Sequence, residues 1–148
     1  LQTMPEMLPD RLESGTHNMP GIAGLLEGIR YVQRTGMENI AAHERRLTAQ
    51  AVKLLRQTEG IRLFWCDGFR HQTGVLSFIV EGTDCEELGE AMARRGVALR
   101  SGLHCAPLAH RTAGTLKTGT VRFSPSAFNT PAQVTQFVQM LQTTLRKM

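Results

Sequence analysis

The apolar residues in the first part of the chain recur at helical spacing. After the proline- and glycine-punctuated residues 1–20, they return every three or four positions across residues 21–34, which predicts a helix. Gly36 interrupts this pattern, and a second helix is predicted over residues 37–58, with Gly60 in the position of a C-terminal cap. Residues 1–20 are predicted to form an irregular arm.

The pattern then changes to short β-branched and aromatic runs. Residues 61–65 and 75–80 flank a turn-prone stretch that includes Asp67-Gly68, and they predict two strands joined as a hairpin. A helix is predicted next, starting at a capping box of Thr83 and Glu86 and stopped by Gly96.

The last part of the chain predicts two short strands and one helix. The strands are predicted at residues 97–99 and 120–123. Thr130, Pro131 and Gln133 have the spacing of an N-cap, a first helical position and a capping box. The whole pattern predicts an α+β fold, in which two N-terminal helices precede a β-β-α-β-β-α order and helices cover one face of a small sheet.

The length and charge of the chain limit the classes of function. Its 148 residues suffice for one core. No apolar run approaches a membrane span, and the first twenty residues do not resemble a signal peptide, so we expect a cytoplasmic protein without a membrane partner. Leu1 is not an initiator Met, which suggests a piece of a longer protein. The net charge of +4 is uneven, because all 13 acidic residues lie at or before Glu90.

The basic C-terminal half predicts an anionic ligand. Residues 91–148 carry eight Lys or Arg and no acid. The basic residues are scattered singly and few aromatic residues lie among them, a pattern that disfavours nucleic acid and favours a small carboxylate or phosphate.

Three cysteines leave one unpaired in any disulfide scheme, and free thiols in a reducing compartment are expected. Cys66 is interpreted as an apolar filler at a strand end, and Cys85 as a partly exposed structural residue. Cys105 lies in residues 100–119, which show no periodicity and hold only positive charge. Positive charge favours a thiolate, so Cys105 is the candidate nucleophile. A zinc site of His104, Cys105 and His110 is disfavoured because the spacing matches no standard finger, and no metal is expected.

Three segments resemble motifs of one enzyme family. Residues 100–106 read RSGLHCA and resemble the R-[AS]-G-x-H-C-A motif of the cysteine desulfurases, which are pyridoxal-phosphate enzymes of the aminotransferase class-V family. Residues 120–130 contain TVRFS and FNT, which are similar to the family's VR-S and (Y/F)NT segment. Residues 11–18 read RLESGTHN and are similar to its R-x-E-[AS]-G-T-x-N segment. The resemblance covers essentially the whole chain.

The resemblance implies a role for each matching residue. Cys105 matches the nucleophile that takes sulfur from L-cysteine as a persulfide and leaves L-alanine, and His104 matches the histidine beside it. Arg122 matches the arginine that binds the substrate carboxylate, and Arg100 matches a second arginine near the substrate. Gly15 and Thr16 match a segment that reaches the cofactor phosphate of the other subunit in the family dimer. The remaining histidines are interpreted as solvated or structural: His17, His43, His71 and His110.

The resemblance also implies what this chain lacks. Family members are roughly 400 residues long, and their large domain holds pyridoxal phosphate through a lysine. Lys53, Lys117 and Lys147 do not lie in that lysine's motif. The chain therefore resembles the small C-terminal domain of a fold-type I enzyme, with residues 1–20 as the arm and residues 21–148 as the domain that carries the Cys105 loop. Such a fragment is expected to be inactive alone.

The implied parent is a cytoplasmic homodimer that supplies persulfide sulfur to an acceptor protein for iron–sulfur cluster or thiocofactor assembly. The segment after Cys105, residues 107–110, differs from better-studied members and leaves the acceptor open. A selenocysteine lyase, or another class-V enzyme in which Cys105 is incidental, is an alternative. A second alternative is an anion-binding module without catalysis.

Overall fold

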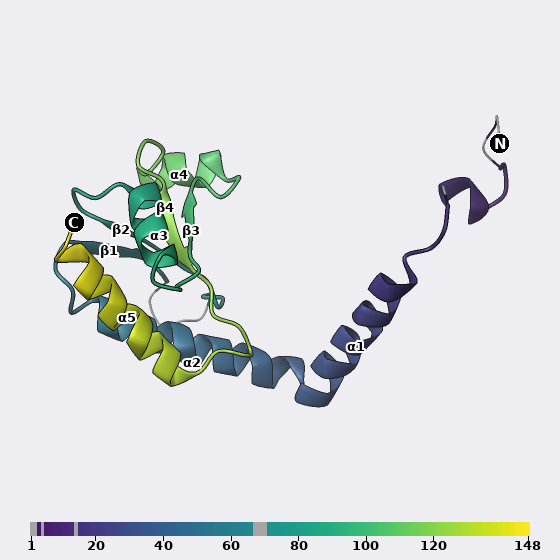
Figure 1. Ribbon diagram of the computed structural model, residues 1–148, viewed down its shortest axis with the longest axis horizontal. Coiled ribbons are helices and arrows are strands. Elements are labelled where there is room, and N and C mark those ends of the chain that lie inside the picture. Colours follow the sequence, from purple (N-terminus) through teal and green to yellow (C-terminus); the bar gives the residue numbers. More distant parts are fainter. Residues whose placement is uncertain (1–2, 4, 14, 67–70) are drawn as a thin grey trace. The chain divides into compact units, whose positions relative to one another are not determined.

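The computed structural model describes residues 3, 5–13, 15–66 and 71–148, and its contacts divide the chain into the units Leu1–Met37 and Glu38–Met148 (Figure 1). The first unit contains the short 3-10 helix η1 (Asp10–Leu12) and the helix α1 (Met19–Thr35). The predicted arm therefore includes a turn of helix and the start of α1. Asn18 caps α1, since its side-chain oxygen accepts a hydrogen bond of 3.0 Å from the Gly21 N–H. No residue of α1 is buried, although its apolar stripe has the predicted spacing.

The second unit is an antiparallel sheet with helices. After α2 (Met37–Leu55), the order is β1 (Ile61–Phe64), β2 (Leu76–Val80), α3 (Cys85–Ala93), β3 (Arg100–Gly102), α4 (Pro107–Ala113), β4 (Thr120–Phe123) and α5 (Pro131–Leu145). The strands lie in the order β1-β2-β4-β3, and every neighbouring pair is antiparallel. The predicted α+β class and the β1–β2 hairpin are confirmed. Within the described part of the chain, no helix has the length and apolar character needed to cross a membrane.

The core lies between one face of the sheet and three helices. Helices α2, α3 and α5 each place apolar side chains against this face. The predicted capping box of α5 is confirmed, because the Thr130 hydroxyl accepts from the Gln133 N–H while the Gln133 side chain accepts from the Thr130 N–H. The buried residues of the core are Leu47, Ala51, Val52, Leu55, Leu76, Phe78, Cys85, Leu88, Met92, Val121, Phe123, Val134, Phe137, Val138 and Leu141.

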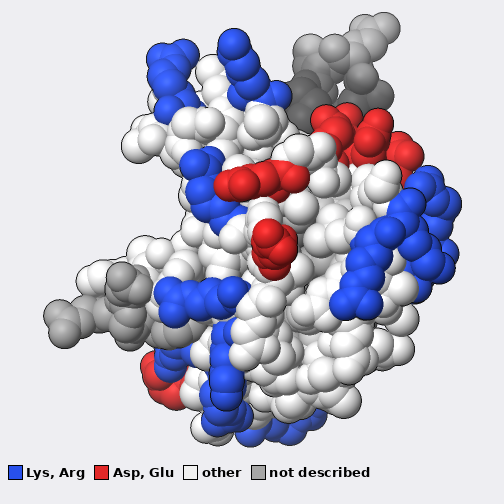
Figure 2. Space-filling model, turned by 90° about the vertical axis from the view of Figure 1, so that its left-hand side faces the viewer, with Lys and Arg blue, Asp and Glu red and all other residues white. Residues whose placement is uncertain are grey.

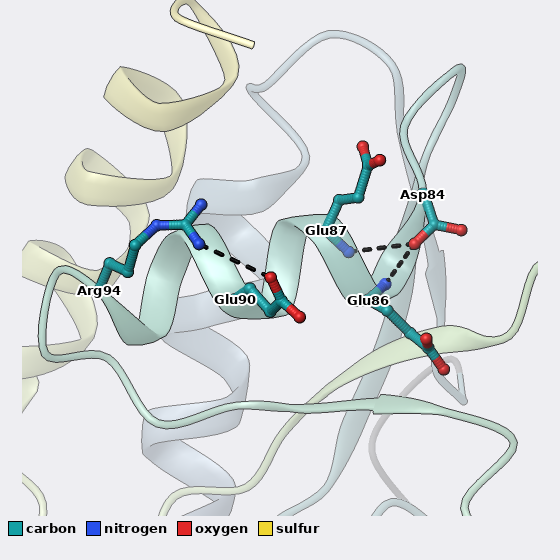
Figure 3. Close-up of polar contacts among 5 residues, drawn as sticks. All are labelled: Asp84, Glu86, Glu87, Glu90 and Arg94. Atoms are coloured by element: carbon teal, nitrogen blue, oxygen red, sulfur yellow. Dashed lines mark hydrogen bonds and ion pairs between the residues drawn. The ribbon is translucent and has the colours of Figure 1, made fainter.

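Three local predictions are wrong. The cap of α3 is Asp84 rather than Thr83, because the Asp84 carboxylate accepts from the N–H groups of Glu86 and Glu87 at 2.8 and 3.0 Å (Figure 3). The strand predicted at residues 97–99 begins at Arg100, where pairing with β4 starts. Residues 100–119, predicted as an irregular loop, contain β3 and α4; the seven residues of α4 are too few to show a helical period in the sequence.

The cysteine environments also differ from two predictions. Cys85 is buried at 7% exposure rather than partly exposed, because its side chain joins the core under α3. Cys66 is exposed rather than a filler of the core, since it follows the end of β1. Cys105 is exposed. The two thiols accessible to solvent are therefore Cys66 and Cys105, and only Cys105 lies among the motif residues.

Candidate functional site

The second face of the sheet, opposite the helical core, carries the candidate substrate residues. Strand register places Phe64 opposite Ser77, Ser77 opposite Arg122, and Arg122 opposite Arg100. Directly opposed residues of antiparallel strands point to the same face, so these four form one row across the whole sheet. Thr120 lies two positions before Arg122 and shares its face. We call this surface the second face; it includes Phe64, Ser77, Arg100, Thr120 and Arg122.

Cys105 lies in a tight turn just after β3. The Ala106 N–H donates a hydrogen bond of 2.9 Å to the Leu103 carbonyl, and the two residues between them, His104 and Cys105, have φ of 52° and 58°. A closing hydrogen bond with positive φ at both central residues is the pattern of a type I′ turn, which glycine or asparagine usually occupies. Two consecutive non-glycine residues in this conformation store backbone strain, a feature that clusters at functional sites. The turn exposes the Cys105 side chain.

His104 ties this turn to the second face. Its Nε2 lies 3.2 Å from the Thr120 carbonyl oxygen and 3.1 Å from the Thr120 hydroxyl oxygen. These contacts join residues 16 positions apart. The same imidazole has a buried Nδ1 without a hydrogen-bond partner among the described residues. The residue next to the candidate nucleophile is therefore held by β4 through one ring nitrogen only.

Helix α4 covers part of the second face and brings a second histidine to His104. His110 is buried, its Nδ1 lies 2.8 Å from the Thr115 hydroxyl, and its ring centre is 5.8 Å from that of His104. A cavity of about 160 Å³ lies between α4 and the strand residues Phe64 and Ser77. Gly114 ends α4 in the left-handed conformation. The structural interpretation of His110 agrees with this environment.

The arginines make the second face cationic. Arg122 is half-buried, and its Nε has no hydrogen-bond partner in the described part of the chain. Arg100, on the neighbouring strand, is exposed. Like charges directly opposite each other in a sheet repel. An anion that contacts both guanidinium groups would relieve this repulsion and satisfy Arg122 Nε, and a carboxylate has the geometry for such contacts.

Burial and charge set the protonation of the neighbouring groups. Burial lowers the pKa of His104, and the positive charge of Arg122 lowers it further. His104 is therefore neutral near neutral pH. Burial raises the pKa of the Cys85 thiol, and the nearby carboxylates of Asp84 and Glu86 act in the same direction. Cys85 is therefore protonated and enclosed, which does not suit a nucleophile.

Carboxylates at the start of α3 and along it lie near residues of the basic C-terminal half. The separation of acidic and basic residues along the sequence did not predict this proximity. Glu86 lies beside Gly102 of β3, with its Oε1 3.8 Å from where a Cβ on that glycine would be. Asp84 is the N-cap of α3, and Glu86, Glu87 and Glu90 follow along the helix (Figure 3). Figure 2 shows acidic side chains gathered among separate Lys and Arg side chains on one face of the molecule. Among the described residues, carboxylates of positions 84–90 therefore lie close to parts of the basic C-terminal half, such as Gly102 and Arg94.

The predicted site residues fall into the two units of the chain. Arg100, His104, Cys105 and Arg122 lie together in the second unit, on β3, the turn and β4. Gly15 and Thr16 belong to the first unit and are exposed there. Among the described residues, no group of three or more His, Cys, Asp or Glu side chains could hold a metal ion. Sequence reasoning missed Thr115 and Thr120, because no motif marks a threonine that holds a histidine ring.

Comparisons with known proteins find a family model and homologues that match most of the chain. The family model described as Aminotransferase class-V matches residues 2–137. The chain is 41% identical over 129 residues to a cysteine desulfurase of Synechococcus elongatus. The aligned region covers 87% of this chain and 20% of that protein. It is 35% identical over 133 residues to a probable cysteine desulfurase of Xylella fastidiosa, and this aligned region covers 90% of this chain and 31% of that protein.

Solved structures show the same fold. The apo structure of a cysteine desulfurase from Thermococcus onnurineus matches with a TM-score of 0.83 and 29% identity, covering 95% of this chain and 34% of that one. The cysteine desulfurase CsdA of Escherichia coli, in an S-sulfonic acid form, matches with a TM-score of 0.81 and 28% identity over the same shares. The chain thus spans about a fifth to a third of the length of these relatives.

Proposed function

Because the chain belongs to the aminotransferase class-V family, we propose that it is the substrate-handling part of a pyridoxal-phosphate-dependent cysteine desulfurase. The observation that carries the proposal is the position of Cys105, an exposed thiol on a strained turn that His104 ties to the arginine-bearing second face. The cysteine desulfurases among its relatives, with the fold match to their C-terminal part, support the same activity.

Cys105 supplies the nucleophile in this proposal. Its thiolate attacks the sulfur of L-cysteine, and the new sulfur–sulfur bond leaves a persulfide on Cys105. The carbon–sulfur bond of the substrate breaks, its electron pair stays with the carbon, and this carbon takes up a proton to give L-alanine. An exposed thiol suits this role, because the persulfide must then be reached by an acceptor.

Arg122 and Arg100 bind the substrate carboxylate. Arg122 is the better placed, since its half-buried guanidinium keeps an unsatisfied Nε–H that a carboxylate oxygen can accept. Arg100 adds the second positive charge from the opposite register position. Both side chains attract the anionic end of an amino acid and orient its side chain relative to Cys105.

Pyridoxal phosphate, when bound, would hold the amino group of the substrate and withdraw electrons from it. Toward this cofactor the chain itself offers the backbone N–H of Gly15 and the hydroxyl of Thr16, which suit a phosphate. Lys53, Lys117 and Lys147 are all exposed, and none of them lies on a strand of the second face. The lysine that anchors the cofactor is therefore proposed to lie in another part of the protein.

The wider setting is proposed from the family. We expect the whole protein to be a cytoplasmic homodimer that passes sulfur from Cys105 to an acceptor protein. This chain alone is expected to be inactive, because it lacks the cofactor lysine.

The proposal is tested on the cofactor-loaded protein that contains this chain. Wild type should release L-alanine from L-cysteine and show one added sulfur on Cys105 by mass spectrometry, and Cys105→Ala should lose both. Cys66→Ala, which removes the other exposed thiol, should keep both. Undiminished alanine release by Cys105→Ala would refute the proposal. A parallel assay with L-selenocysteine distinguishes a selenocysteine lyase.

A further inference from the structure

Two buried polar atoms near Cys105 have no hydrogen-bond partner among the described residues. They are Nδ1 of His104 and Nε of Arg122. Buried polar groups are hydrogen-bonded in the great majority of cases, and an exception calls for a missing partner. The two atoms lie in one site, because the charge of Arg122 acts on His104 and the ring of His104 is held by Thr120, two positions from Arg122 on β4.

The contacts of His104 determine which kind of partner its free nitrogen needs. A carbonyl oxygen only accepts hydrogen bonds, so the contact between Nε2 and the Thr120 carbonyl requires the proton on Nε2. A neutral imidazole with Nε2–H has a bare lone pair on Nδ1. Protonation of Nδ1 is opposed by burial and by Arg122, so this nitrogen stays an acceptor. Nδ1 of His104 therefore needs a hydrogen-bond donor, whereas Arg122 Nε needs an acceptor.

An amino acid with a thiol supplies both complements. Its carboxylate accepts from Arg122. Its amino group is the one that the proposed cofactor holds, so the thiol is the donor that remains for this chain to recognise. We infer that Nδ1 of His104 accepts a hydrogen bond from the thiol of the substrate and so aligns its sulfur beside Cys105. This inference rests on the proposed function and adds to it a specificity-determining residue for the side chain of the substrate.

The geometry also assigns a positioning role to Thr120. Its carbonyl accepts from Nε2–H and so sets the tautomer that leaves Nδ1 free, and its hydroxyl oxygen lies 3.1 Å from the same nitrogen. His110, whose Nδ1 is held by the Thr115 hydroxyl, lies beside His104 with its ring centre 5.8 Å from that of His104. The acceptor is thus fixed by side chains from β4 and α4 before any ligand arrives, as a selective site requires.

The first test measures the tautomer directly. Long-range ¹H–¹⁵N NMR of this chain should show His104, identified by its absence in His104→Gln, as a neutral ring with the proton on Nε2. Thr120→Val, which keeps the carbonyl and removes the hydroxyl, should keep this tautomer, because the carbonyl can only accept from Nε2–H. A wild-type ring with its proton on Nδ1 would overturn the inference, because Nδ1 would then be a donor.

The second test measures recognition of the thiol in the cofactor-loaded protein. His104→Gln keeps an N–H for the Thr120 carbonyl and removes the Nδ1 acceptor. Its kcat/KM for L-cysteine should fall about tenfold, the effect of one lost buried hydrogen bond. L-alanine has no thiol, so its affinity for the variant should equal its affinity for wild type. The absorbance of the bound cofactor measures this affinity. His71→Gln, at an exposed histidine, is the matched control.

The outcomes separate this inference from the proposed function. A wild-type protein that releases no alanine from L-cysteine means that the proposed function fails. A wild type that is active and carries the Cys105 persulfide, with His104→Gln equally active, means that only the inference fails. Equal weakening of L-cysteine and L-alanine binding would also overturn it, because the contact would then not involve the thiol.

Discussion

Arg100 and Arg122 lie directly opposite each other on β3 and β4, so two guanidinium groups extend from the same face of a four-stranded sheet. The arrangement is unfavourable for the chain alone, because opposed like charges in a sheet repel. It is favourable once an anion binds between them. In the proposed function, the site would exchange some stability of the free protein for affinity toward a carboxylate, as functional sites commonly do.

Removal of one of these charges should stabilise the chain. Arg100→Gln is expected to raise the free energy of unfolding in urea by about 0.2–1 kcal/mol at low ionic strength, and added salt should reduce the gain. Arg94→Gln is the control, since it removes an arginine that lies 3.6 Å from Glu90 and should not stabilise (Figure 3). An Arg100→Gln variant less stable than wild type would show that the two charges do not repel in the free chain.

The three thiols should react at different rates with iodoacetamide. Cys85 is buried and its pKa is raised by that burial, so it is expected to be alkylated last near neutral pH. Cys66 and Cys105 are exposed and should both be alkylated before Cys85. Peptide mass spectrometry over a time course measures the order. Early labelling of Cys85 in the folded chain would contradict the packing of α3 on the sheet.

The protonation of His104 should make the stability of the chain depend on pH. Its pKa is lowered in the folded state, first by burial and then by Arg122. When the pH falls below about 6.5, the ordinary value for histidine, the unfolded chain binds a proton that the folded chain does not. The contribution of His104 is therefore retained above this pH and lost progressively below it.

His104→Gln isolates this contribution. The free energy of unfolding of wild type minus that of His104→Gln should be larger at pH 7.5 than at pH 5.5, measured by urea titration. His71→Gln provides the reference for removing an exposed imidazole. A difference that grows toward acid pH would mean that the folded state favours the charged ring, against the environment described for it.

Features set by neighbouring residues could be predicted from the sequence. The capping box of Thr130 and Gln133 spans only four positions of the sequence, and both of its hydrogen bonds are present. At the start of α3 the sequence pattern predicts Thr83 as the cap, whereas the Asp84 carboxylate accepts from the N–H groups of Glu86 and Glu87. Local patterns therefore predict that a helix exists better than they predict its first residue.

Features set by distant partners could not be predicted in this way. The start of β3 depends on its pairing with β4, about twenty positions later. The bond between His104 and Thr120, and the row from Phe64 to Arg100, need the whole strand order before they exist. The motif resemblance pointed to Cys105, Arg100 and Arg122 because family patterns preserve such residues, but it carried no information on the threonines that hold the histidines.

The glycine before Thr120 should be required for the geometry of the site. Gly119 has a φ of +63°, and a Cβ there would lie 2.9 Å from Cys85 Sγ and 3.0 Å from Gly102 Cα. Gly119→Ala therefore combines an unfavourable backbone conformation with a clash between β4, β3 and α3. Gly82 has a similar φ of +73°, but a Cβ there would meet nothing within 4 Å.

The two glycines form a matched pair of variants. Gly82→Ala should cost about 1–2 kcal/mol of unfolding free energy from the left-handed backbone alone. Gly119→Ala should cost about 1–3 kcal/mol more, because overpacking is added. It should also shift the NMR signals of the His104 ring, since Thr120 follows directly. Equal losses for the two variants would mean that Cys85 and Gly102 do not pack closely against Gly119, and that Gly119 is not needed to place Thr120 beside His104.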